Sequence, residues 1–177
     1  TTNGWTASNF HTAVNNQGET IVLVRNSANS KIFCGYAPQS FTSSGSHKYG
    51  SNAFLFNLSD GYQLKQFMSV YQIYDNANYG PTFGGAPDLA FPNSTLNSAG
   101  SVQYTSVHSY EYPSSKGAFS YLHGGTSNQY FVPNEIEVYK IDTCTTSTPV
   151  LSLPTNTSPT YTTVTLGATV DSDGGAA

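Results

Sequence analysis

Short runs of β-branched and aromatic residues recur along the chain at the length of a β-strand, and this pattern limits the fold most. Residues 20–25 form one such run, and residues 31–36 form the next, after a polar stretch that favours a turn. Two strand-forming runs separated by a short turn predict a β-hairpin. Further strands are predicted at residues 53–58, 66–74, 88–91 and 134–141.

A helical period occurs at one place only. Trp5, Phe10 and Val14 recur at roughly helical spacing, and either Thr6 or Ser8 is a suitable N-cap for a short helix. No long helical period follows Val14, so the sequence predicts a mainly β fold. Residues 40–51 are polar and rich in glycine, which is typical of a surface loop that carries contacts.

Composition limits the partners that this chain can have. The 177 residues suit one domain with a short appendage, and charged residues make up only 9% of them. Six Lys and Arg residues against a net charge of −4 give no cationic face for nucleic acid or anionic lipid. No apolar stretch has the length of a membrane span. With so few charged residues, the solubility of the chain depends on Ser, Thr, Asn and Gln. This composition is typical of a secreted or cell-surface protein.

Two blocks of sequence carry a family resemblance. Residues 79–85 read Tyr-Gly-Pro-Thr-Phe-Gly-Gly, and residues 135–139 read Glu-Ile-Glu-Val-Tyr. Together with Gly4-Trp5, Phe10-His11 and the strands at 20–24, 33–36 and 52–58, they resemble the TLDc domain over residues 4–141. The resemblance is to the extracellular-looking version of the domain rather than the intracellular oxidation-resistance version. It implies a two-layer antiparallel β-sandwich with one or two short flanking helices, and no agreed catalytic mechanism.

The sequence changes character after Asp142. We expect a TLDc-like domain at residues 1–142, a Thr/Ser linker at 143–149, and a third segment at 150–177. Residues 149–154 and 164–170 alternate like strands and resemble the start of an immunoglobulin-like or fibronectin-like repeat of bacterial surface proteins. A complete sandwich needs roughly seven strands. The segment is therefore either an incomplete immunoglobulin-like domain or a strand donated to a neighbouring copy.

Cys34 and Cys144 allow one internal disulfide. It would close a loop of about 110 residues and contribute roughly 4 to 5 kcal/mol in the chain-entropy model. The bridge requires the two segments to be neighbours, which the sequence does not establish.

Acidic residues offer a candidate catalytic site. Glu135 and Glu137 lie two apart on a predicted strand and share one face, where Asp88 or Glu111 could complete a paired-carboxylate site. A hydrogen-bond network that holds the fold explains them equally well. We expect no cofactor and no metal site; Asp171-Ser172-Asp173-Gly174 is similar to half a calcium loop but lacks the distal Glu.

Two further features allow both a functional and a structural interpretation. Gly80, Gly84 and Gly85 could present backbone N–H groups to an anion, but a turn where two backbones pass closely needs the same residues and is favoured. Numerous tyrosines beside Asn, Ser and Gly suit stacking on neutral sugars or peptides, although such rings also half-bury on sheet faces. The ligand-binding candidates are Tyr49, Tyr79, His47 and Asp88.

The function predicted from these observations is an extracellular, non-enzymatic binding or adhesion module that contacts a glycan or a protein ligand through its loops. It would belong to a surface or fibre-forming protein, with neither nucleic acid nor membrane insertion involved. One alternative is a structural filament subunit that assembles through its C-terminal strands. Another is a glycoside hydrolase that uses Glu135 or Glu137, in which case these carboxylates should line an open cleft.

Overall fold

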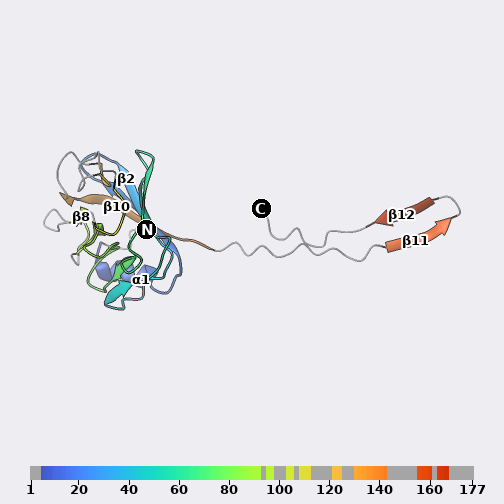
Figure 1. Ribbon diagram of the computed structural model, residues 1–177, viewed down its shortest axis with the longest axis horizontal. Coiled ribbons are helices and arrows are strands. Elements are labelled where there is room, and N and C mark those ends of the chain that lie inside the picture. Colours follow the sequence, from blue (N-terminus) through green and yellow to red (C-terminus); the bar gives the residue numbers. More distant parts are fainter. Residues whose placement is uncertain are drawn as a thin grey trace. The chain divides into compact units, whose positions relative to one another are not determined.

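The computed structural model describes residues 5–92, 95–97, 103–105, 108–112, 121–124, 130–142, 155–160 and 163–167. The chain divides into two compact units, Thr1–Ile141 and Asp142–Ala177. In the second unit, β11 (Thr155–Thr160) and β12 (Thr163–Gly167) pair as an antiparallel hairpin (Figure 1). A two-stranded hairpin is at best marginally stable by itself in water.

The first unit begins with the helix that the sequence predicts, α1 (Ala7–Val14). Thr6 is its N-cap, and the Thr6 side chain accepts a hydrogen bond from the backbone N–H of Asn9. The buried face of α1 consists of Ala7, Phe10, His11 and Val14.

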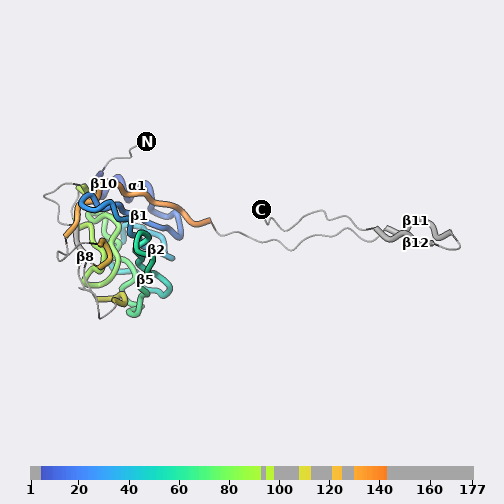
Figure 2. The backbone as a smooth tube through the Cα atoms, turned by 90° about the horizontal axis from the view of Figure 1, so that it is seen from above, coloured from blue at the N-terminus to red at the C-terminus, as the bar shows by residue number. Residues whose placement is uncertain are grey.

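A five-stranded antiparallel sheet forms the first layer, in the order β10-β1-β2-β4-β5 (Figures 1 and 2). Its strands are β1 (Thr20–Asn26), β2 (Ile32–Ala37), β4 (Phe54–Asn57), β5 (Tyr62–Lys65) and β10 (Pro133–Lys140). The predicted hairpin is present, because β1 pairs with β2 from Thr20–Ala37 to Arg25–Ile32. β5 was not predicted, since only Leu64 within it is buried and its apolar signal is weak.

Shorter strands form the second layer. They are β3 (Ser46–Lys48), β6 (Ile73–Asp75), β7 (Leu89–Ala90), β8 (Gln103–Thr105) and β9 (Tyr130–Phe131). β3 pairs with β6, and β7, β8 and β9 pair in that order. Isolated bridges from Phe83 to Ile73 and to Leu89 join the two groups. The fold is therefore mainly β, as predicted: a two-layer antiparallel arrangement with one short helix among the described residues.

The glycines of the 79–85 block lie where backbones and rings approach closely. A Cβ at Gly85 would lie 2.5 Å from the ring of Tyr71, and one at Gly80 would lie 2.8 Å from Leu96. Gly84 has a φ of +92° and contacts the Asp88 carboxylate. Close packing thus accounts for these glycines, in agreement with the structural interpretation of the block.

Two segments differ from the sequence prediction. The strand predicted over residues 66–74 is present only at its end, as β6, because the preceding residues form a turn in which Tyr71 N–H donates to Met68 O. Phe67 and Val70 in this stretch are exposed. The predicted loop at 40–51 contains β3, whose three residues carry too little apolar character to be predicted.

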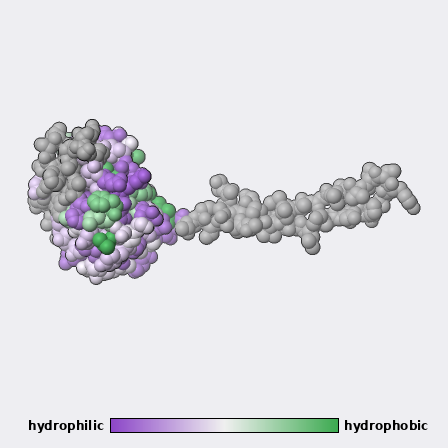
Figure 3. All heavy atoms as spheres, viewed as in Figure 1, coloured by the Kyte–Doolittle hydropathy of each residue, from purple (hydrophilic) through white to green (hydrophobic). Residues whose placement is uncertain are grey.

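Two rows of mainly apolar residues cross the outer face of the five-stranded sheet. Leu23, Cys34 and Phe56 lie opposite one another in register across β1, β2 and β4. Ile21, Tyr36 and Phe54 form the adjacent row. On the face shown in Figure 3, apolar residues form small patches within a largely hydrophilic surface. No helix within the described ranges is long and apolar enough to cross a membrane.

Candidate functional site

The polar loop after β2 is organised by one buried carboxylate. Asp75, at the end of β6, accepts backbone N–H groups from Thr42 at 3.0 Å, Ser43 at 2.9 Å and Ser44 at 3.0 Å. The Thr42 hydroxyl adds a hydrogen bond of 2.8 Å, and Lys48 Nζ lies 3.4 Å from Asp75 Oδ2. The side chain of Asp75 is fully buried, so the loop encloses it.

The electrostatics of Asp75 follow from these contacts. Burial alone would raise the pKa of Asp75, but hydrogen bonds from the backbone of Ser44 and Thr42 and from the Thr42 hydroxyl outweigh burial. The pKa of Asp75 is therefore held well below its ordinary value. The carboxylate of Asp75 compensates the positive charge of Lys48.

Beside this loop, five half-buried rings form a continuous chain, which we name the ring row. Its members, in order, are Tyr79, Tyr74, His47, Tyr71 and His108. The centroids of successive rings are 5.1, 4.8, 5.0 and 5.5 Å apart. Such separations are those of favourable aromatic pairs. Since β3 and β6 pair with His47 opposite Tyr74, sheet register sets the centre of the row.

The folded chain favours the neutral form of His47. Its pKa is lowered from the ordinary value, mainly by burial and further by the nearby His108. The Nδ1 atom of His47 is buried and has no hydrogen-bond partner within the described part of the chain. Protonation of His47 would therefore place a poorly solvated charge in the middle of the row.

Asp88 is fully buried and binds the backbone at the His108 end of the ring row. Its carboxylate accepts the backbone N–H groups of His108 at 2.8 Å, Ser109 at 2.9 Å and Tyr110 at 3.2 Å. Burial raises the pKa of Asp88 to about 6, although these hydrogen bonds act in the opposite direction. The side chain of Ser109 accepts the N–H of Gly85 at 2.9 Å and contacts His108 Nδ1 at 2.8 Å.

His11 holds the Tyr79 end of the ring row. Its Nε2 lies 3.0 Å from the carbonyl oxygens of both Asn76 and Tyr79, so α1 fixes the turn that presents Tyr79. The Tyr74 hydroxyl accepts a hydrogen bond of 3.1 Å from the Asn76 side chain. Both ends of the row are therefore anchored to buried polar groups.

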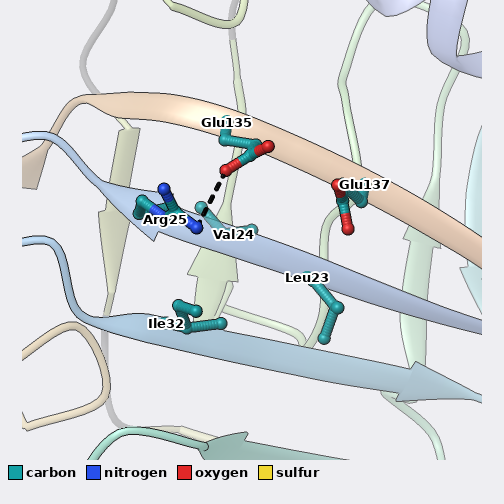
Figure 4. Close-up of a pocket in the computed structure, with 6 residues that line it drawn as sticks. All are labelled: Leu23, Val24, Arg25, Ile32, Glu135 and Glu137. Carbon is teal, nitrogen blue, oxygen red and sulfur yellow. Dashed lines mark ion pairs between the residues drawn. The ribbon is translucent and has the colours of Figure 1, made fainter.

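Glu135 and Glu137 lie away from the ring row, on the outer face of the first sheet. Figure 4 shows them on β10 beside Arg25, Leu23 and Ile32, around a hollow of about 60 Å³. Glu135 pairs with Arg25 at 3.3 Å, and Glu137 accepts the Tyr139 hydroxyl at 2.6 Å. Ligand pockets typically measure about 300–1,000 Å³. The hollow is thus too small to enclose a sugar ring.

Comparison with known families matches the TLDc domain to residues 1–142. The chain belongs to the TLDc domain family. No curated protein matches the chain significantly. The family resemblance seen in the sequence is thereby confirmed, whereas the extracellular type and the immunoglobulin-like repeat stay predictions.

The structure brings together two of the four predicted ligand-binding residues of this TLDc domain. His47 and Tyr79 both belong to the ring row. Asp88 is fully buried beneath it, and Tyr49 is 68% exposed but makes no ring contact among the described residues. Tyr71 and His108 were missed as candidates, because their places follow from long-range contacts: Tyr71 packs on Gly85, and Asp88 binds the backbone N–H of His108.

The remaining sequence candidates of the TLDc domain are not joined into a site. Cys34 is buried in β2 and has no disulfide partner among the described residues, and Cys144 lies outside them, so the disulfide stays a prediction. Asp171 and Asp173 also lie outside them. Within the described ranges, no three His, Cys, Asp or Glu side chains are grouped so that they could hold a metal ion.

Proposed function

We propose that this TLDc domain is an extracellular, non-enzymatic binding module whose ring row contacts a neutral glycan. The observation that carries the proposal is the unbroken chain of five partly exposed rings from Tyr79 to His108. Ring faces and edges beside hydroxyl and amide groups suit the apolar faces and hydroxyls of a sugar. The charged form of His47 is disfavoured and Lys48 is paired to Asp75, which suits a ligand without charge.

Rigidity also supports the proposal. Tyr71 packs on Gly85, His47 and Tyr74 are cross-strand partners, and Tyr79 is presented by a turn bound to His11. Rings already fixed in place lose little conformational entropy when a ligand binds. The small hollow at Glu135 and Glu137 gives the alternative of a glycoside hydrolase no comparable support.

A glycan array probed with the full chain tests the proposal, followed by titration of any glycan that binds. We expect Tyr79→Ala to weaken binding by about three- to tenfold, from the ordinary worth of an aromatic contact. Tyr139→Ala is the matched control, because Tyr139 is 51% exposed and lies on the other sheet. Equal loss in both variants, or no glycan binding at all, would contradict the proposal. If the chain instead captures a protein in a pull-down and Tyr79→Ala abolishes that capture, the ligand of the ring row is a protein and not a glycan.

A further inference from the structure

The outer edge of β10 carries backbone groups that pair with no strand among the described residues. Ile141 N–H donates to Glu19 O, and the register places Glu19 opposite Ile141. In an antiparallel ladder, hydrogen-bonded pairs alternate with non-hydrogen-bonded pairs. The pairs that bond to β1 therefore involve Glu135, Glu137 and Tyr139. The N–H and C=O groups of Ile136 and Val138 point away from β1, and among the described residues no strand pairs with them.

A groove lies next to this edge, where residues of β10 and α1 line it together. Its volume is about 140 Å³, similar to engineered cavities of about 150 Å³ that bind benzene. Most of its lining residues are apolar, namely Phe10, Ala13, Val14, Leu96, Ile136 and Val138, and Thr6 and Asn9 complete it. A strand added along β10 would lie about 4.8 Å from it and turn every second side chain toward the face of Ile136 and Val138. The edge and the groove together form an acceptor for an extended segment with alternating apolar residues.

The chain itself contains such a segment. Val164, Leu166, Ala168 and Val170 alternate with Thr165, Gly167 and Thr169, and residues 155–170 contain no charged residue. Residues 163–167 form β12, whose only strand partner among the described residues is β11. A lone hairpin does not bury the apolar face of such a strand, and docking against a larger sheet would.

We propose that the β10 edge and its groove accept the segment 163–170 of a second copy of this chain. Each copy then carries one donor segment and one acceptor groove. The contact joins copies into a chain, or closes a dimer where two copies exchange segments reciprocally. This inference does not depend on glycan binding, because the ring row lies on the other sheet.

Paired substitutions in the full chain test the inference. Ala13→Glu places a charge in the groove from an exposed helix position, and Thr12→Glu adds the same charge to the neighbouring exposed position outside the groove lining. On the donor side, Leu166→Glu disrupts the apolar face of the segment, and Thr165→Glu changes the opposite face. Thermal unfolding of all four variants checks that each one folds.

The measurement is the mass of the particles in solution over a range of concentrations, by sedimentation or light scattering. We expect the unaltered chain to assemble as concentration rises, and Ala13→Glu and Leu166→Glu to weaken this assembly by about tenfold or more. Thr12→Glu and Thr165→Glu should leave it unchanged. A mixture of Ala13→Glu and Leu166→Glu should form one-to-one dimers, because one intact donor meets one intact acceptor.

Any one of the following results would overturn the inference. A chain that stays monomeric at every concentration has no such contact. Assembly that survives Ala13→Glu does not use the groove, and assembly that survives Leu166→Glu uses a different segment. Equal effects of Ala13→Glu and Thr12→Glu would assign the loss to the helix and not to the groove.

Discussion

The ring of Phe83 lies directly on the backbone of Gly35, and this contact joins the two layers of the fold. Gly35 lies in the central strand of the first sheet, and Phe83 bridges the two strand groups of the second. A Cβ at Gly35 would lie 2.5 Å from the ring atoms of Phe83. Both residues are fully or nearly fully buried, so neither can move into solvent to relieve the overlap.

Gly35→Ala should therefore destabilise the domain. Overpacking a well-filled core costs about 1–3 kcal/mol, and we expect the upper half of that range here because a rigid ring meets a rigid strand. Chemical denaturation measures the loss. Phe83→Leu removes part of the ring, so the double variant Gly35→Ala/Phe83→Leu should lose less stability than the sum of the two single variants. Additive losses would show that the contact does not couple the two layers.

Asp75→Asn should loosen the loop at residues 42–45. The amide retains one acceptor oxygen in place of two and loses the attraction to Lys48, so we expect a loss of about 2–3 kcal/mol in the free energy of unfolding. Asp60→Asn is the control, since Asp60 forms a partly exposed ion pair with Lys31 and should contribute less than about 1 kcal/mol. Similar losses in both variants would contradict the role given to Asp75.

The same carboxylate should control part of the acid stability. Because the pKa of Asp75 is lower in the folded chain than in the unfolded chain, its contribution is present above the unfolded pKa of about 3.9. The contribution is lost as the pH falls from there toward the folded pKa. Denaturation curves below pH 4 should therefore decline less steeply for Asp75→Asn than for the unaltered chain. Parallel curves would refute this assignment.

Much of the fold is visible in the sequence, whereas the candidate site is only partly visible. The hairpin at residues 20–36 and the close-packed turn at 79–85 follow from local residue types, because β-branched runs and glycines act within a few positions. The ring row depends on the pairing of β3 with β6 and on bridges at Phe83, which are long-range contacts between short elements. His47 and Tyr79 could be proposed singly, but their connection through Tyr74 could not.

His47 should titrate below its ordinary pKa of about 6.5. A base whose pKa is lowered by folding binds protons more readily in the unfolded chain, so the stability of the fold falls as the pH drops through 6.5. An NMR titration of the imidazole resonances measures the pKa directly. His47→Phe keeps a ring in the row and removes the titration, and it should lose less stability between pH 7 and 5 than the unaltered chain. A His47 pKa at or above the ordinary value would be inconsistent with the burial described for Nδ1.

Cys34 should be unreactive in the folded chain. Burial raises the pKa of its thiol to about 12, so the nucleophilic thiolate is almost absent at pH 8, and the side chain is fully buried in the outer face of the first sheet. Labelling with a disulfide reagent at pH 8, followed by peptide mapping, should leave Cys34 unmodified until denaturant is added. Cys144 is mapped in the same experiment: if the two cysteines are bridged, neither is labelled in denaturant until a reductant is present, and if they are not, both are labelled at once. Rapid labelling of Cys34 without denaturant would show that β2 opens locally, and would contradict the packing of Cys34 between Leu23 and Phe56.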